Sequence, residues 1–96
     1  MPIGDRKVTA KKDVEVKNRL GLHARPCSKF VKLASSFHAE IWVSKDDESV
    51  NGKSIMGLMM LAAGQGSKLL LTAEGHDAEA ALIALEVLIN QKFDED

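Results

Sequence analysis

The stretch Gly21-Leu22-His23-Ala24-Arg25-Pro26 marks the point where a strand pattern gives way to a helix pattern. Gly21 interrupts the alternation of apolar and polar residues that precedes it. From Ala24 to Phe37 the apolar residues recur at helical spacing. Pro26 fits the first turn of a helix, where the backbone amides have no internal partner to lose. The sequence therefore predicts a helix that begins directly after His23.

The segments on either side of this helix predict a small sheet and two more helices. Alternation favours strands at 13–18 and 40–44, a short strand at 48–51 and a central strand at 67–74. Ser54 caps a helix that the glycines at 64 and 66 end, and Asp77 caps a last helix whose apolar stripe extends to Ile89. Helices that are apolar along one stripe need a sheet face to cover. The order of these elements therefore predicts a two-layer α+β sandwich.

The length and composition indicate one small globular domain. The chain has 96 residues, of which 45% are hydrophobic and 28% charged. Residues 1–12 are polar and unpatterned, so we expect a flexible N-terminal extension before a domain at 13–96. The acidic end of the chain, at residues 94–96, is interpreted as a solvated tail. So short a chain favours chemistry at its surface rather than in a deep pocket.

The composition also argues against several kinds of partner and site. The net charge is −1 without a basic stripe, which disfavours nucleic acid. No run approaches about 18 apolar residues and the first residues lack a signal core, so we expect a cytoplasmic protein without direct membrane insertion. Cys27 stands alone and is interpreted as a buried structural thiol. Spacings typical of a P-loop, an EF-hand or a zinc site are missing, so we expect no cofactor and no metal.

His23 and Arg25 are the candidate site residues whose side-chain chemistry is most informative. The free amides and the positive dipole end at a helix N-terminus favour an anion. Arg25 adds a permanent cation that can bond phosphate oxygens in a forked geometry. Histidine is available as a neutral nucleophile near physiological pH. These parts suit uptake and release of a phosphoryl group, although a plain surface histidine at a loop–helix junction is the simpler alternative.

Two separated motifs in this chain resemble the HPr family of the bacterial sugar phosphotransferase system. The first is GLHARP at 21–26, and the second is NGKSIMGLMML at 51–61, which is similar to the regulatory-serine segment of that family. The resemblance covers residues 13–91. It implies an open-faced sandwich, in which three helices cover one side of a four-stranded antiparallel sheet.

The resemblance also implies the roles of the site residues. His23 would be phosphorylated on Nδ1 by enzyme I, itself charged by phosphoenolpyruvate, and would pass the group to a histidine of an enzyme IIA domain. Arg25 would neutralise the phosphate. The protein would be a monomeric carrier without turnover of its own, rather than an enzyme.

Regulation and docking are implied for the second motif. Ser54 occupies the position that HPr kinase/phosphorylase modifies in some bacteria, and transcriptional regulators are further expected partners. The partner-binding surface implied by the family comprises Leu22, Ala24, Ile55, Met56 and Met59, of which Met56 is expected to be the most exposed. Two alternatives stay open: a carrier in a nitrogen-related or incomplete regulatory chain, and a binding module that transfers nothing.

Overall fold

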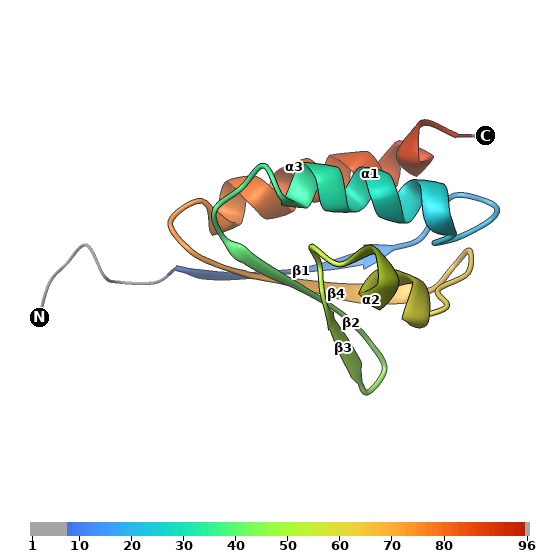
Figure 1. Cartoon of the computed structure of the whole chain (residues 1–96), viewed down its shortest axis with the longest axis horizontal. Coiled ribbons are helices and arrows are strands. Elements are labelled where there is room, and N and C mark those ends of the chain that lie inside the picture. The colour runs from blue at the N-terminus through green and yellow to red at the C-terminus, as the bar shows by residue number, and fades with distance from the viewer. Residues whose placement is uncertain (1–7, 96) are drawn as a thin grey trace, which may run out of the picture.

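Four antiparallel strands form a single sheet in the computed structural model, which describes residues 8–95 (Figure 1). The strands are β1 (Thr9–Glu15), β2 (Glu40–Lys45), β3 (Glu48–Asn51) and β4 (Lys68–Glu74). Their order across the sheet is β1-β4-β2-β3, and each neighbouring pair is antiparallel. The last strand in sequence therefore lies between the first two, and β1 forms one edge.

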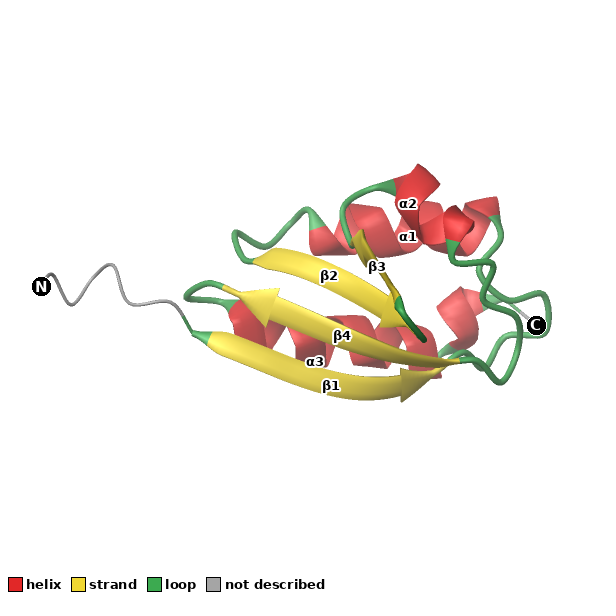
Figure 2. Ribbon diagram, turned by 90° about the horizontal axis from the view of Figure 1, so that it is seen from below, coloured by secondary structure: helices red, strands yellow, loops and turns green. Residues whose placement is uncertain are grey.

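Three helices cover one face of this sheet and leave the other open (Figures 1 and 2). They are α1 (Ala24–Ala34), α2 (Ile55–Met60) and α3 (Ala78–Asn90), and a 3-10 turn, η2 (Lys92–Asp94), follows α3. The helices α1 and α3 lie side by side, and α2 packs beside α1 near β3. The predicted order of elements and the predicted open-faced α+β sandwich are thus confirmed.

Alternation along the central strand explains the two layers. In β4 the side chains of Leu69, Leu71 and Ala73 are buried, while the residues between them are more exposed. Side chains on a strand alternate between its faces, so the buried set meets the helices. Each fully buried leucine contributes about 1.5–3 kcal/mol relative to exposure. From above, α1 adds Cys27 and Phe30 to the same core.

The first strand differs from its prediction. It begins at Thr9 rather than at residue 13 and ends at Glu15 rather than at residue 18. Residues 9–12 pair in register with residues 71–74 of β4, so the expectation of a flexible segment at 1–12 is wrong for 9–12. Backbone pairing at a sheet edge needs no apolar alternation, and the lysines at 11 and 12 stay exposed. The rest of that expectation, at residues 1–7, lies outside the described residues.

The helix ends also depart from the predictions. The first helix stops at Ala34 rather than Phe37, and the second stops at Met60, ahead of the glycines expected to end it. Asp77 precedes α3, but its side chain forms no cap. Its carboxylate oxygens instead accept the amides of His38 and Ala39, both at 2.8 Å, and these bonds lower the pKa of Asp77. Asp77 therefore anchors the turn between α1 and β2.

Within residues 8–95, no helix is long and apolar enough to cross a membrane.

Candidate functional site

His23 occupies the N-cap position of α1 with extended backbone angles, φ −84° and ψ −173°. Its carbonyl accepts the amide of Cys27 at 3.1 Å, while its ring forms no capping bond. The ring therefore does not cap the start of the helix. The side chain is 37% exposed, which leaves it open to a partner at the surface.

The backbone before His23 is shaped by Gly21. This glycine has a φ of +70°, and a β-carbon built on it would lie 2.5 Å from the carbonyl oxygen of Ala63. Only glycine tolerates both the left-handed conformation and that approach. The amide of Leu22 donates to the same Ala63 oxygen at 2.9 Å. The loop that carries the histidine is thus fixed against the loop that follows α2.

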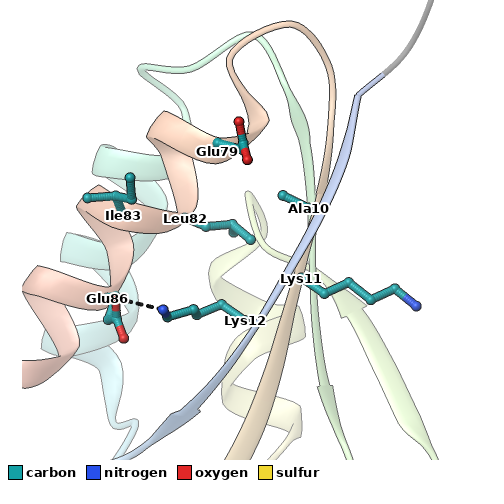
Figure 3. Close-up of a pocket in the computed structure, with 7 residues that line it drawn as sticks. All are labelled: Ala10, Lys11, Lys12, Glu79, Leu82, Ile83 and Glu86. Carbon is teal, nitrogen blue, oxygen red and sulfur yellow. Dashed lines mark ion pairs between the residues drawn. The ribbon is translucent and has the colours of Figure 1, made fainter.

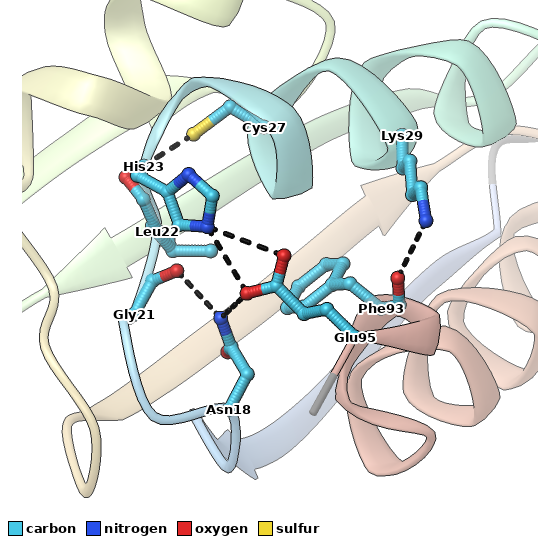
Figure 4. A network of polar contacts seen from close by, with 8 residues as sticks. All are labelled: Asn18, Gly21, Leu22, His23, Cys27, Lys29, Phe93 and Glu95. Carbon is cyan, nitrogen blue, oxygen red and sulfur yellow. Dashed lines mark hydrogen bonds and ion pairs between the residues drawn. The ribbon is translucent and has the colours of Figure 1, made fainter.

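A carboxylate from the far end of the chain contacts the His23 ring (Figure 4). Nε2 lies 3.0 and 3.2 Å from the two carboxylate oxygens of Glu95. Oε1 of Glu95 also accepts Nδ2 of buried Asn18 at 2.8 Å, and that Nδ2 donates to the carbonyl of Gly21 at 2.7 Å. The interpretation of the acidic end as a solvated tail is wrong for Glu95, whose side chain is 17% exposed.

This contact assigns the tautomer of the neutral ring. An ionised carboxylate only accepts hydrogen bonds, so the hydrogen lies on Nε2 of His23 and Nδ1 carries the lone pair. The bond from His23 lowers the pKa of Glu95, followed by the bond from Asn18, and the charge of Arg25 acts in the same direction. Glu95 therefore stays ionised well below neutral pH.

The surroundings of Nδ1 suit an anion. This nitrogen faces away from Glu95 in Figure 4. His23 immediately precedes the first turn of α1, whose leading amides lack intrahelical partners. Arg25 lies exposed in that turn. His23 and Arg25, which the sequence predicted as the reactive pair, thus both lie at the N-terminus of α1.

The helix α2 presents an apolar patch, defined as Ile55, Met56, Met59 and Met60. Met56 is 75% exposed, in agreement with its prediction, and Met60, which the sequence reasoning missed, is 70% exposed. A six-residue helix has room to bury only one side, and here Leu58 is its buried residue. Exposed apolar patches of this kind are typical of interaction sites.

Ala24 and Leu22, the two remaining residues of the predicted docking surface, differ in exposure. Ala24 is exposed beside His23. Leu22 is only 7% exposed and belongs to the hydrophobic core, so its assignment to a docking surface is wrong. The amide of Leu22 donates to the Ala63 carbonyl, while its side chain packs in the core.

Ser54 and Cys27 take the structural positions predicted for them. Oγ of Ser54 accepts the amide of Gly57 at 3.0 Å and so caps α2. Cys27 is fully buried, and its thiol donates to the carbonyl of Leu22 at 3.5 Å. Burial raises the pKa of Cys27 to about 11, so the thiol stays protonated. Among the described residues, no group of three side chains could hold a metal ion.

A hollow of about 200 Å³ lies between β1 and α3 (Figure 3). An ion pair of 3.5 Å between Lys12 and Glu86 crosses it, and both side chains are partly exposed. Such pairs contribute about 0–1 kcal/mol. The hollow shares no residue with the His23 network, so it is a separate surface feature.

Fold and site together define a class of small α+β protein that presents a histidine at the N-terminus of its first helix. Residues 10–91 match the family model described as "PTS HPr component phosphorylation site". The chain therefore belongs to the HPr family of phosphocarrier proteins of the phosphotransferase system.

Individual relatives and structures agree with this membership. Phosphocarrier protein HPr of Neisseria meningitidis is 53% identical over 85 residues, covering 88% of this chain and 96% of that protein. Phosphocarrier protein NPr of Shewanella violacea is 43% identical over 84 residues, covering 88% and 92%. A crystal structure of HPr from Thermoanaerobacter tengcongensis superposes with a TM-score of 0.87 at 50% identity, covering 91% and 98%. An HPr dimer from that organism has a TM-score of 0.73 at 54% identity, covering 85% and 94%.

Glu95 and Asn18 are the functional residues that sequence reasoning missed. Glu95 lies 72 positions after His23, and nothing in its local sequence distinguishes it from its acidic neighbours. The signal that could have found it is Phe93, a large apolar residue within a polar end, which is 1% exposed and ties the segment to the core.

Proposed function

We propose that His23 accepts a phosphoryl group on Nδ1 from a phosphohistidine of enzyme I and passes it to a histidine of an enzyme IIA domain in sugar uptake. The observation that carries this proposal is that the two ring nitrogens of His23 have different surroundings. Nε2 is bonded to Glu95, while Nδ1 faces away from that carboxylate. His23 is the N-cap residue of α1, and Arg25 lies in the first turn of that helix. Membership of the phosphocarrier family supports the same direction of chemistry.

In the proposed step, the lone pair of Nδ1 forms a bond to phosphorus. The bond between phosphorus and the donor nitrogen breaks, and its electron pair returns to the donor ring. The ring of His23 keeps the proton on Nε2 and becomes cationic, facing the Glu95 carboxylate. The leading amides of α1 and the guanidinium of Arg25 stabilise the phosphoryl oxygens. Transfer onward reverses these changes with the acceptor ring.

Partner enzymes would dock on the apolar patch of α2 together with Ala24. Flexible methionines suit a surface that must fit more than one partner. The patch is exposed next to α1, whose first turn carries the reactive residues. Contact there would bring the donor or acceptor histidine to Nδ1. We expect a monomeric protein that docks in this way without a cofactor.

Ser54 is proposed as a regulatory site for HPr kinase/phosphorylase. Its hydroxyl already accepts a hydrogen bond at the start of α2, so a phosphate there would not disrupt the helix. The phosphate would add about −1.5 to −2 charges beside the apolar patch. Docking of enzyme I would weaken, and binding of transcriptional regulators would become possible.

A second candidate function is a carrier in a nitrogen-related or otherwise regulatory chain. The relatives include a phosphocarrier named NPr as well as phosphocarriers named HPr, so this alternative stays open beside sugar uptake. A binding module without transfer is less well supported, because both residues are present, His23 partly exposed and Arg25 exposed.

The test is incubation with phosphoenolpyruvate and enzyme I, read by intact mass and by ³¹P NMR. We expect an acid-labile gain of one phosphoryl group in the native protein and none in His23→Ala. His38→Ala, which removes an exposed histidine outside the site, should behave as the native protein. Absence of the gain with an active enzyme I would refute the carrier function.

A further inference from the structure

The end of the chain adopts an unusual conformation that brings a carboxylate to the active ring. Lys92, Phe93 and Asp94 have φ values of 58°, 55° and 60°. A left-handed conformation costs about 1–2 kcal/mol for each residue that is not glycine. Two contacts hold the turn: the Phe93 ring is buried, and Nζ of Lys29 donates to the Phe93 carbonyl at 2.7 Å. These contacts stabilise the turn, and the turn places Glu95 beside His23.

The carboxylate of Glu95 covers one nitrogen of the ring. Both of its oxygens contact Nε2 (Figure 4), at distances of 3.0 and 3.2 Å. Its position is fixed from a second side by Asn18, which is fully buried and bonded to the backbone of Gly21. A phosphorus atom approaching Nε2 would have to displace this carboxylate. It would also meet a nitrogen that carries hydrogen rather than a lone pair.

We propose that Glu95 determines which ring nitrogen of His23 carries the phosphoryl group. By accepting from Nε2, it covers that nitrogen and keeps the lone pair on Nδ1. This inference rests on the proposed function, since it presupposes that His23 takes up a phosphoryl group. Glu95 is a positioning residue here, because it contacts neither the phosphorus nor the donor.

The experiment uses phosphoramidate, a small donor that needs no docking surface. The ring lone pair bonds to phosphorus, and the phosphorus–nitrogen bond of the donor breaks with its electrons, so that ammonia leaves. The hydrogen on the other ring nitrogen stays in place. With ¹⁵N-labelled protein, coupling between ³¹P and ¹⁵N identifies the phosphorylated nitrogen. We expect the native protein to react on Nδ1 alone.

Two variants of the full chain make this test specific. In Glu95→Ala both nitrogens are accessible, and we expect at least as much product on Nε2 as on Nδ1. Asp94→Ala removes an exposed neighbouring carboxylate from the same segment and should retain the Nδ1 product. The ring ¹⁵N shifts before reaction give a second readout, since Glu95→Ala should gain the tautomer with hydrogen on Nδ1. Amide spectra confirm that both variants are folded.

The outcomes separate this inference from the proposed function. Reaction of Glu95→Ala on Nδ1 alone, or a mixture of products in the native protein, would overturn the role of Glu95. Because phosphoramidate acts without an enzyme, the regiochemistry stays readable even if enzyme I fails to phosphorylate His23. That failure would refute the carrier function and leave the effect of Glu95 on the ring intact.

Discussion

The substitution Phe93→Ala tests how the end of the chain is held against His23. The native ring is 1% exposed and anchors three successive left-handed residues at 92–94. Removing the ring takes away the main force that keeps this turn formed. We expect the segment from Lys92 to Glu95 to detach while the sandwich itself stays folded.

The magnitudes follow from burial and backbone strain. A buried aromatic side chain removes about 150–250 Å² from water, which corresponds to about 4–6 kcal/mol. The three left-handed residues together cost about 3–6 kcal/mol. Because these totals are similar, Phe93→Ala loses the burial but also relieves the strain. We therefore expect the free energy of unfolding to fall by only about 0–1 kcal/mol, the difference between burial and strain.

Phe30→Ala is the matched control. Phe30 is 2% exposed in the middle of α1 and has no strained segment to release, so its loss should cost about 3–5 kcal/mol. The assay is urea denaturation of both variants, with the His23 ring ¹⁵N shifts recorded in each. Phe93→Ala should change those shifts because Glu95 leaves Nε2. Equal losses of stability in the two variants, or unchanged ring shifts in Phe93→Ala, would refute the reasoning.

Three further predictions concern the phosphoryl site, its regulation and the response to pH. Arg25→Ala should slow phosphorylation by enzyme I by about 10- to 100-fold, the equivalent of one charge-assisted bond, and initial rates with Arg25→Lys should be intermediate. Ser54→Ala should lower the free energy of unfolding by about 1 kcal/mol through loss of the cap, whereas Ser54→Asp should keep the cap and slow enzyme I; urea denaturation and initial rates separate these effects. Asp77 has a pKa lowered mainly by the amides of His38 and Ala39, so its contribution to stability is present above its unfolded pKa of about 3.9 and is lost as pH falls through the folded value. The stability difference between the native protein and Asp77→Asn should therefore shrink below about pH 4 in urea titrations, and a constant difference would contradict this assignment.

Local patterns predicted most of the fold because most elements bury one regular face. The alternation in β4 and the helical spacing after His23 are direct consequences of that burial. The start of β1 was not predictable in this way. Its residues 9–12 are held by backbone pairing at the sheet edge, which leaves little trace in side-chain pattern. Asp77 was placed at the right position, but its bonds to the turn before β2 depend on tertiary structure.

In the candidate site too, residues placed by local sequence could be predicted, and residues placed by tertiary contacts could not. His23, Arg25 and Ser54 could be predicted because each lies at the start of a helix that the local sequence pattern indicates. Glu95 was missed because its role depends on a turn that no local pattern encodes. Leu22 was misassigned because its burial depends on packing in the tertiary structure, which its position beside His23 does not reveal.

The two proposed modification sites, His23 and Ser54, would be connected through the docking surface rather than through the contacts that shape the His23 loop. That loop is held by Ala63, which accepts the amide of Leu22 and closely approaches Gly21. Ala63 follows the C-terminal end of α2, whereas Ser54 caps its N-terminal end. A phosphate on Ser54 would therefore add charge beside the methionines of the apolar patch without touching the bonds that position His23. Its effect on transfer should appear in the encounter with enzyme I, while the uptake of phosphoryl from a small donor stays unchanged.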